Sequence, residues 1–184
     1  MEDSARSYRR FLDGDNEGMV ELIKCYRDGL ILYINGIVRN ISVAEELAED
    51  VFVKLVVDRP RFSGKSSFKT WLYAIGHNIA CDHLRRRKRS REVAEADVSL
   101  LADEEDLWRS YCKKEEKLAV HGALAKLHDD YAQVLYLVYF EELSNREAAA
   151  VMHKSTRQIE NLLYRAKIAL RTELEKEGFV YEEI

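Results

Sequence analysis

The chain has few of the residues that break or crosslink secondary structure. Its 184 residues include one proline, eight glycines and three cysteines. So little proline and glycine argues against a turn-rich β protein, and the apolar residues recur at intervals of three and four rather than two. We therefore expect an all-α fold. A hydrophobic content of 47% in this length can supply the core of one ordinary domain or of two small ones.

The cysteines, Cys25, Cys81 and Cys112, form no CxxC pair, and their odd number fits no closed disulfide framework. This usage favours a reducing cytosol over secretion. The sequence also has no N-terminal segment typical of a signal peptide and no apolar run as long as a membrane span. We expect a cytoplasmic protein without membrane insertion, and no further domain after Ile184.

The formal net charge is −4, which alone argues weakly against nucleic-acid binding. Residues 59–91 are nevertheless strongly basic, with Asp82 as the one acid. An aromatic, partly buried helix expected over 68–84 runs into residues 85–91, where six of seven side chains are cationic. Such a surface can follow a phosphate backbone. It also fits a solvated helix end, because cations favour the negative C-terminal end of the helix dipole.

Apolar spacing predicts the helices of the first half of the chain. Residues 21–41 carry a helical apolar stripe, with a break expected near Gly29. The segment from Ser42 to Glu45 has the form of a capping box and predicts the start of the next helix. Residues 59–67 contain the single proline and predict a basic loop.

The composition turns acidic over residues 92–112, where we expect a connector between two domains. The first domain then spans 1–91 and the second 113–184. The second is predicted to begin with a helix over 114–127 and to continue with another over 131–140.

Two capping boxes, which begin at Ser144 and Ser155, predict a pair of helices in the second domain. Alanines 148–150 let a second helix cross closely, and His153 and Lys154 provide the turn, which is helix-turn-helix geometry. The second helix can present polar side chains to base edges in a major groove. The same pattern also fits an ordinary antiparallel helix pair.

Together these segments resemble the extracytoplasmic-function (ECF) sigma factors, the minimal two-domain sigma subunits of bacterial RNA polymerase. The likeness covers nearly the whole chain. The Ala-Glu-Glu-Leu-Ala-Glu-Asp-Val-Phe run at 44–52 is similar to the family's core-binding helix, residues 67–86 to its region 2 signature, and residues 127–174 to region 4. The resemblance implies two small helical domains, a sigma region 2 bundle and a sigma region 4 helix-turn-helix, joined by the acidic linker.

The resemblance also implies a function. Such a protein binds core RNA polymerase and directs promoter-specific initiation, with region 2 recognising the minus-10 element and region 4 the minus-35 element. The implied partners are the clamp helices and flap of core polymerase, promoter DNA and an anti-sigma factor. No cofactor, metal or catalytic residue is expected, since the chemistry belongs to the polymerase.

The matching positions give candidate site residues. Those implied to face the clamp helices are Glu45, Glu46, Glu49 and Asp50. Those implied for minus-10 DNA are Arg61, Phe62, Ser63, Lys65, Lys69, Asn78, Arg85 and Arg86. Those implied for minus-35 DNA are Ser155, Thr156, Arg157, Gln158, Asn161, Tyr164 and Arg165.

Several of these positions have a second interpretation. Phe62 equally fits a core plug, and Asp82 is expected to be structural, paired with Arg86 one turn away. Glu160 stands in the recognition helix where the family commonly has a basic residue, and it would repel phosphate unless it accepts from a cytosine amino group. On the aromatic helix, the residues expected in the core are Trp71, Leu72, Ile75 and Ile79.

Two other functions compete with the sigma interpretation. A helix-turn-helix regulator that acts without polymerase leaves the acidic 44–52 helix and the aromatic 68–84 helix unexplained. A carboxylate-metal enzyme would need Glu-x-x-His motifs, which are absent near Glu45 to Asp50. His77 and Cys81 lie one turn apart, but two ligands are a weak metal signal.

Overall fold

The structure, a computed structural model, describes residues 2–93 and 122–176, and these residues contain helices and no strands. The predicted all-α fold is confirmed. Residues 122–126 are helical as well. The named elements are α1 (Glu2–Leu12), α2 (Glu17–Val38), α3 (Ile41–Val57), α4 (Phe68–Val93), α7 (Asp129–Leu135), the π-helical turn η1 (Tyr136–Phe140), α8 (Asn145–Val151) and α9 (Thr156–Lys176).

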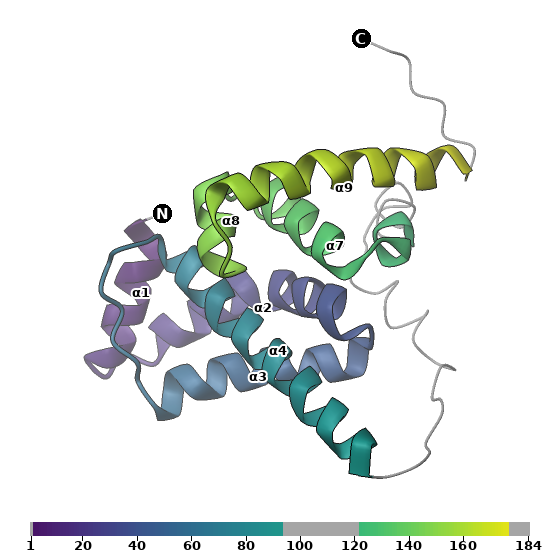
Figure 1. Cartoon of the computed structure of the whole chain (residues 1–184). Coiled ribbons are helices and arrows are strands. Elements are labelled where there is room, and N and C mark those ends of the chain that lie inside the picture. Colours follow the sequence, from purple (N-terminus) through teal and green to yellow (C-terminus); the bar gives the residue numbers. More distant parts are fainter. Residues whose placement is uncertain (1, 94–121, 177–184) are drawn as a thin grey trace.

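Helices α1 to α4 form a bundle around α2, which packs against the other three (Figure 1). Helix α2 is continuous, so the break expected at Gly29 is wrong. The α2–α4 crossing is close because Gly76 has no side chain: a Cβ there would lie 3.2 Å from a methyl group of Leu30. Leu30 itself is fully buried, so this crossing is the centre of the bundle.

The N-cap of helix α3 lies two residues before the predicted cap, Ser42. This N-cap is Asn40, whose side-chain oxygen accepts a hydrogen bond from the Val43 backbone N–H at 2.8 Å. Arg39, the C-cap of α2, has the left-handed conformation, so Arg39 and Asn40 are the only residues between the two helices. Asparagine caps a helix as well as serine does, and the earlier start buries Ile41.

An aromatic cluster joins α1, the loop before α4, and α4. The rings of Tyr8 and Phe62 lie 5.5 and 5.3 Å from that of Trp71, and Phe68 lies 5.4 Å from it. Leu72 is fully buried, and the remaining residues of the predicted stripe, Trp71, Ile75 and Ile79, are partly buried against the core. The core role expected for this stripe is therefore confirmed.

The C-terminal helices include the predicted helix-turn-helix. Ser144 and Glu147 form the expected capping box of α8, and Ser155 and Gln158 bond reciprocally at the start of α9. His153 makes the turn with a left-handed φ of 52°. The helix expected over 131–140 is instead α7 followed by the η1 turn.

The expected connector at 92–112 and the first part of the 114–127 helix lie outside the described residues, apart from the last two residues of α4.

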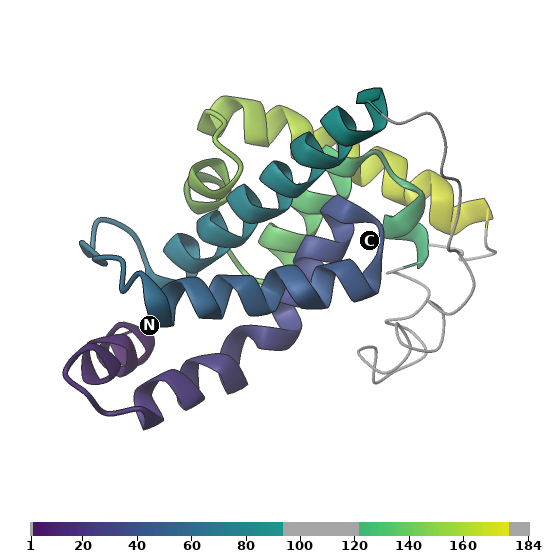
Figure 2. The same cartoon turned by 90° about the horizontal axis from the view of Figure 1, so that it is seen from below.

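Residues 122–176, which we call the helix-turn-helix part, pack directly on the N-terminal bundle of α1 to α4. Helix α8 lies against α4, and α7 lies against α2 (Figures 1 and 2). The buried residues of both parts form one continuous hydrophobic core, in which the Tyr33 and Tyr136 rings are 6.1 Å apart. The two parts therefore form one packed body in this structure.

Candidate nucleic-acid interface

The acidic residues predicted on α3 lie mainly on its outer face. Glu46, Glu49 and Asp50 are exposed, whereas Glu45 is partly buried and approaches the Arg27 guanidinium at 3.9 Å. The outward face of α3 is therefore acidic over its first three turns, while Glu45 turns toward α2.

The same face carries three exposed valines that the sequence interpretation missed. Val53, Val56 and Val57 are 55%, 43% and 71% exposed. Val53 and Val57 also line a groove of about 440 Å³ between α3 and α4. The sequence could have revealed their exposure, because these valines do not fall on the helical stripe of buried α3 residues. We call Glu46, Glu49, Asp50 and the three valines the α3 strip.

The loop between α3 and α4 is held at two points. The Pro60 carbonyl accepts a hydrogen bond from the Tyr8 hydroxyl at 2.8 Å, and Phe62 packs its ring into the aromatic cluster. Between and after these anchors, the candidate residues Arg61, Ser63 and Lys65 are exposed. The packing of Phe62 agrees with its interpretation as a core plug, and the loop presents polar side chains from a fixed base.

The candidate residues of α4 fall into two groups. Lys69 and Asn78 face the helix-turn-helix part: the Lys69 ammonium lies 2.9 Å from a Glu141 carboxylate oxygen, and the Asn78 side-chain oxygen lies 2.7 Å from His153 Nε2. Farther along, Arg85 and Arg86 are exposed.

Asp82 forms an ion pair with Arg85, not with the predicted Arg86. The pair has i,i+3 spacing, which suits a helix as well as the i,i+4 spacing that was expected. This geometry fits a structural role for Asp82, whose carboxylate holds the Arg85 guanidinium.

Helix α9 presents its candidate residues to solvent. Its buried side includes Ile159, Leu163 and Ala166, which pack on the core. Tyr164 is 69% exposed, and Glu160 is also exposed. The exposed candidates are Ser155, Thr156, Arg157, Gln158, Asn161, Tyr164 and Arg165. Ser155 directly precedes α9 and the others occupy its first three turns, where a recognition helix meets a major groove.

His77 is buried where α4 meets the helix-turn-helix part. It is 9% exposed, its Nδ1 lies 3.0 Å from the Tyr33 hydroxyl, and its ring centroid lies 5.8 Å from that of His153. Burial, with the nearby His153 and Lys154, lowers the pKa of His77 to about 4. His77 is therefore neutral at physiological pH, and it packs as an uncharged side chain in a site shielded from water.

Within the described ranges, no group of three or more His, Cys, Asp and Glu side chains is placed to hold a metal ion. The nearest pairing of the kind considered above joins His77 Nε2 and Cys81 Sγ at 3.5 Å. In the same ranges no helix is both long and apolar enough to cross a membrane.

The sequence matches two families of known proteins. Residues 22–90 match Sigma-70 region 2, and residues 117–170 match Sigma-70, region 4. The RNA polymerase sigma factor YlaC of Bacillus subtilis is 29% identical over 164 residues, covering 87% of this chain and 94% of that protein. The ECF RNA polymerase sigma factor SigC of Mycobacterium tuberculosis is 31% identical over 137 residues, covering 74% and 72%.

Solved structures show the same fold. The sigma factor RpoE, in complex with the anti-sigma factor NepR from Bartonella quintana, superposes with a TM-score of 0.66 at 20% identity, covering 84% of this chain and 95% of that one. CnrH, in complex with the cytosolic domain of CnrY, gives a TM-score of 0.61 at 22% identity, covering 95% and 96%. Fold and matches together define a two-domain sigma-70 protein. Within that class, the chain belongs to the ECF RNA polymerase sigma factors.

Proposed function

We propose that this sigma factor binds core RNA polymerase through the α3 strip and directs it to promoters with two DNA-binding surfaces. The minus-10 surface consists of the loop before α4 and α4 itself, and the minus-35 surface consists of the first three turns of α9. The observation that carries the proposal is the α3 strip, because a regulator that binds only DNA has no use for it. The catalysis is the polymerase's, and the site of action is the cytoplasm.

The α3 strip has the composition of a protein-binding surface. Exposed apolar side chains that cluster on one face mark interaction sites, and Val53, Val56 and Val57 form such a cluster. The acidic residues Glu46 and Asp50 border it and would steer the strip toward a basic partner. The clamp helices of the largest polymerase subunit are the partner that the family membership supplies.

The minus-10 surface suits a single strand that is held by its backbone. Arg61, Ser63 and Lys65 extend from a loop whose two anchors, Pro60 and Phe62, fix its position. A fixed loop can hold an extruded base without a large ordering cost. Beyond it, exposed Arg85 and Arg86 continue the positive surface along α4 and would neutralise phosphates.

The minus-35 surface suits a duplex major groove. Arg157 and Gln158 lie in the first turn of α9, and Asn161 and Arg165 follow on the exposed side. Arginine pairs with guanine, and glutamine or asparagine pairs with adenine, through two hydrogen bonds each. Glu160 would then accept a hydrogen bond from a cytosine amino group, since it would otherwise face phosphate.

An anti-sigma factor is a further partner that we propose. RpoE, whose fold this chain shares, was solved with the anti-sigma factor NepR, and CnrH, which also shares the fold, was solved with the cytosolic domain of CnrY. The α3 strip would be its target, because covering the strip would exclude polymerase.

The binding proposal is tested by measuring the affinity of purified chain for core polymerase. Reversal of two charges, Glu46→Lys with Asp50→Lys, is expected to weaken binding about a hundredfold, because both charges face the basic partner. The matched control is Asp13→Lys with Glu17→Lys, which changes the net charge equally on exposed residues of the same bundle. Absence of any core binding by the unmodified chain would sink the proposal.

A further inference from the structure

We propose that Gln158 reads the minus-35 element as a hydrogen-bond donor alone, and that it therefore selects a keto base, guanine or thymine, against an amino base, adenine or cytosine. The inference rests on the proposed minus-35 role of α9 and assigns a base preference to one of its residues. The observation that carries it is the capping box at the start of α9, which engages one end of the Gln158 amide in the absence of DNA.

The capping box fixes which way round the Gln158 amide lies. The Ser155 backbone N–H donates to Gln158 Oε1 at 2.7 Å, and the Gln158 backbone N–H donates to the Ser155 hydroxyl oxygen at 3.2 Å. A backbone N–H must meet an acceptor, and the oxygen is the only acceptor of a glutamine side chain. Because Gln158 is exposed, its NH2 group is the end that is left to face a ligand.

The backbone of Ser155 is itself held in place. The preceding residue, Lys154, donates its N–H to the Ala149 carbonyl at 3.0 Å, and its ammonium lies 3.1 Å from an Asp130 carboxylate oxygen. On the other side, Ile159 is fully buried, and its N–H donates to the Ser155 carbonyl at 3.1 Å. The N–H that closes the capping box therefore comes from a fixed turn.

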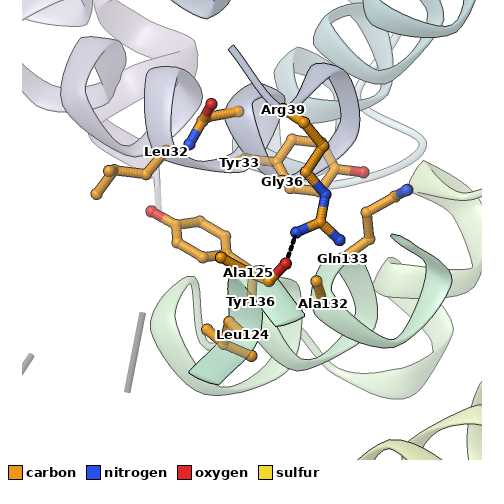
Figure 3. A pocket seen from close by; sticks show the side chains of 10 residues that line it. Leu32, Tyr33, Gly36, Arg39, Leu124, Ala125, Ala132, Gln133 and Tyr136 are labelled. Carbon is orange, nitrogen blue, oxygen red and sulfur yellow. Dashed lines mark hydrogen bonds between the residues drawn. The ribbon is translucent and has the colours of Figure 1, made fainter. Parts of the chain in front are cut away.

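The start of α7, which carries Asp130, is anchored as well. The Arg39 guanidinium bonds the Ala125 carbonyl (Figure 3), and it donates to the Leu127 carbonyl at 2.7 Å. It also donates at 2.9 Å to the carboxylate of Asp129, which directly precedes Asp130. Polar contacts thus connect the end of α2, through the first turn of α7, to the turn before α9.

A second capping box in the same chain shows what the outer end of such a side chain does. In α8, Glu147 Oε2 accepts from the Ser144 N–H at 3.0 Å and from the Ser144 hydroxyl at 2.8 Å. The other oxygen, Oε1, accepts from the Ser67 and Thr70 hydroxyls, each at 3.0 Å. One end of the side chain caps the helix and the other bonds groups outside it. Gln158 has the same position in its own box, with a donor as its outer end.

A donor at this position distinguishes bases by the groups on their major-groove edges. Guanine O6 and thymine O4 accept hydrogen bonds there, whereas the adenine N6 and cytosine N4 amino groups donate. The usual pairing of glutamine with adenine uses both the amide oxygen and the NH2 group, and the oxygen of Gln158 is already engaged by Ser155. Adenine keeps N7 as an acceptor but sets its N6 donor beside it. The Gln158 NH2 group therefore favours a keto base.

Gln158→Glu tests this assignment, because it keeps the capping box and changes only the outer end of the side chain from a donor to an acceptor. Glutamate is the residue that α8 has at the same position. Core polymerase with the chain transcribes a promoter library that is randomised across the minus-35 element, and the transcribed promoters are sequenced. Gln158→Ala identifies the base position concerned, since the preference at that position should disappear.

At that position the unmodified chain should favour guanine or thymine about tenfold over adenine or cytosine, and Gln158→Glu should reverse the preference. The matched control is Thr172→Glu, which adds the same charge at an exposed residue of α9 beyond its first three turns. It should weaken the use of all promoters without changing the base preference. A preference for adenine in the unmodified chain, or an unchanged preference in Gln158→Glu, would overturn the inference.

Hydrogen exchange at the Ser155 amide tests whether the capping bond survives DNA binding. In the chain bound to a minus-35 duplex, this amide proton should exchange no faster than in the free chain, because Gln158 Oε1 still accepts from it. Faster exchange in the complex would mean that DNA releases the amide oxygen, and Gln158 would then not be a donor alone.

Failure of the proposed function has a different signature. A library from which the polymerase complex selects no minus-35 sequence would refute the proposed minus-35 role of α9 itself. A selected element with an amino base at the Gln158 position would leave that role intact and contradict only the donor assignment.

Discussion

The two surfaces that we propose for DNA binding differ in how far their side chains are already bonded within the protein. The α9 surface is open: Arg157, Asn161 and Tyr164 extend to solvent from a helix whose other side is packed. The α4 surface is partly engaged, since Lys69 and Asn78 bond residues of the helix-turn-helix part. The proposed α9 surface is therefore free of contacts that DNA would have to replace, whereas the proposed α4 surface is not.

The largest effect on stability is expected from a substitution in the core where α2 crosses α4. Leu30→Ala empties a fully buried site at the α2–α4 crossing and should lower the free energy of unfolding by about 3 kcal/mol. Chemical denaturation measures it. The partly exposed Val20→Ala is the control, expected within about 0.5 kcal/mol of the unmodified chain. A cost below about 1 kcal/mol for Leu30→Ala would show that the crossing is not the centre of the bundle.

The next effect is a pH dependence of the folding stability that arises from His77, which is buried between α4 and the helix-turn-helix part. The folded-state pKa of His77, about 4, lies below its ordinary value of 6.5, so the unfolded chain binds a proton first as the pH falls. Stability from this group is present above pH 6.5 and is lost toward pH 4. Between pH 7 and pH 5 the loss should be about 2 kcal/mol.

The groups that face His77 are Tyr33 from α2, Cys81 from α4, Asp130 from α7, and His153 and Lys154 from the turn before α9. His77→Gln should flatten the pH dependence of unfolding.

Glu141 and Glu147 bond Lys69, Ser67 and Thr70 across the contact between the two parts. In the double variant Glu141→Ala with Glu147→Ala, NMR titration should find the His77 pKa moved toward 6.5, because loss of these bonds exposes the contact to water. An unchanged pKa in that variant would mean that His77 is shielded by the bundle alone.

A smaller effect is expected at the open surface. Arg157→Ala should weaken binding to a minus-35 duplex about tenfold, in the free chain and in the polymerase complex alike, because no other part of the described chain competes for this residue. Arg171→Ala, two turns beyond the contact region on the same helix, is the control. If Arg157→Ala mattered only in the polymerase complex, the α9 surface would not be open in the free chain.

The smallest effect is expected from the cap of α8. Ser144→Ala removes one half of the capping box while leaving the Glu147 contacts with Ser67 and Thr70 possible. The expected loss is about 1 kcal/mol in thermal or chemical unfolding. An unchanged free energy of unfolding would show that Ser144 contributes nothing as the cap of α8.

Local patterns predicted much of the fold and of the candidate surfaces. The Ser144 capping box lies within four consecutive residues, and the basic end of α4 is continuous in sequence, so both were visible without coordinates. The start of α3 was misplaced because Asn40 and Ser42 are both good caps, and only the burial of Ile41 decides between them.

Contacts between distant segments could not be predicted in this way. Lys69 and Glu141 are 72 residues apart, and nothing in either neighbourhood pairs them. The same holds for Gly29, where a Cβ would lie 2.5 Å from the Tyr73 hydroxyl and 2.7 Å from a Glu141 carboxylate oxygen, both far away in the sequence. The exposed valines of the α3 strip were detectable, but only as residues that do not fit the buried stripe.

The central claim, that this chain directs polymerase to promoters through two DNA surfaces, is tested most directly by transcription in vitro. Core polymerase with the chain should transcribe a subset of a randomised promoter library that shares a minus-35 and a minus-10 element. Arg85→Ala with Arg86→Ala should abolish these transcripts at moderate salt, whereas Arg6→Ala with Arg9→Ala on α1 should preserve them. Transcripts that core polymerase makes equally well alone, or that survive loss of Arg85 and Arg86, would contradict the account.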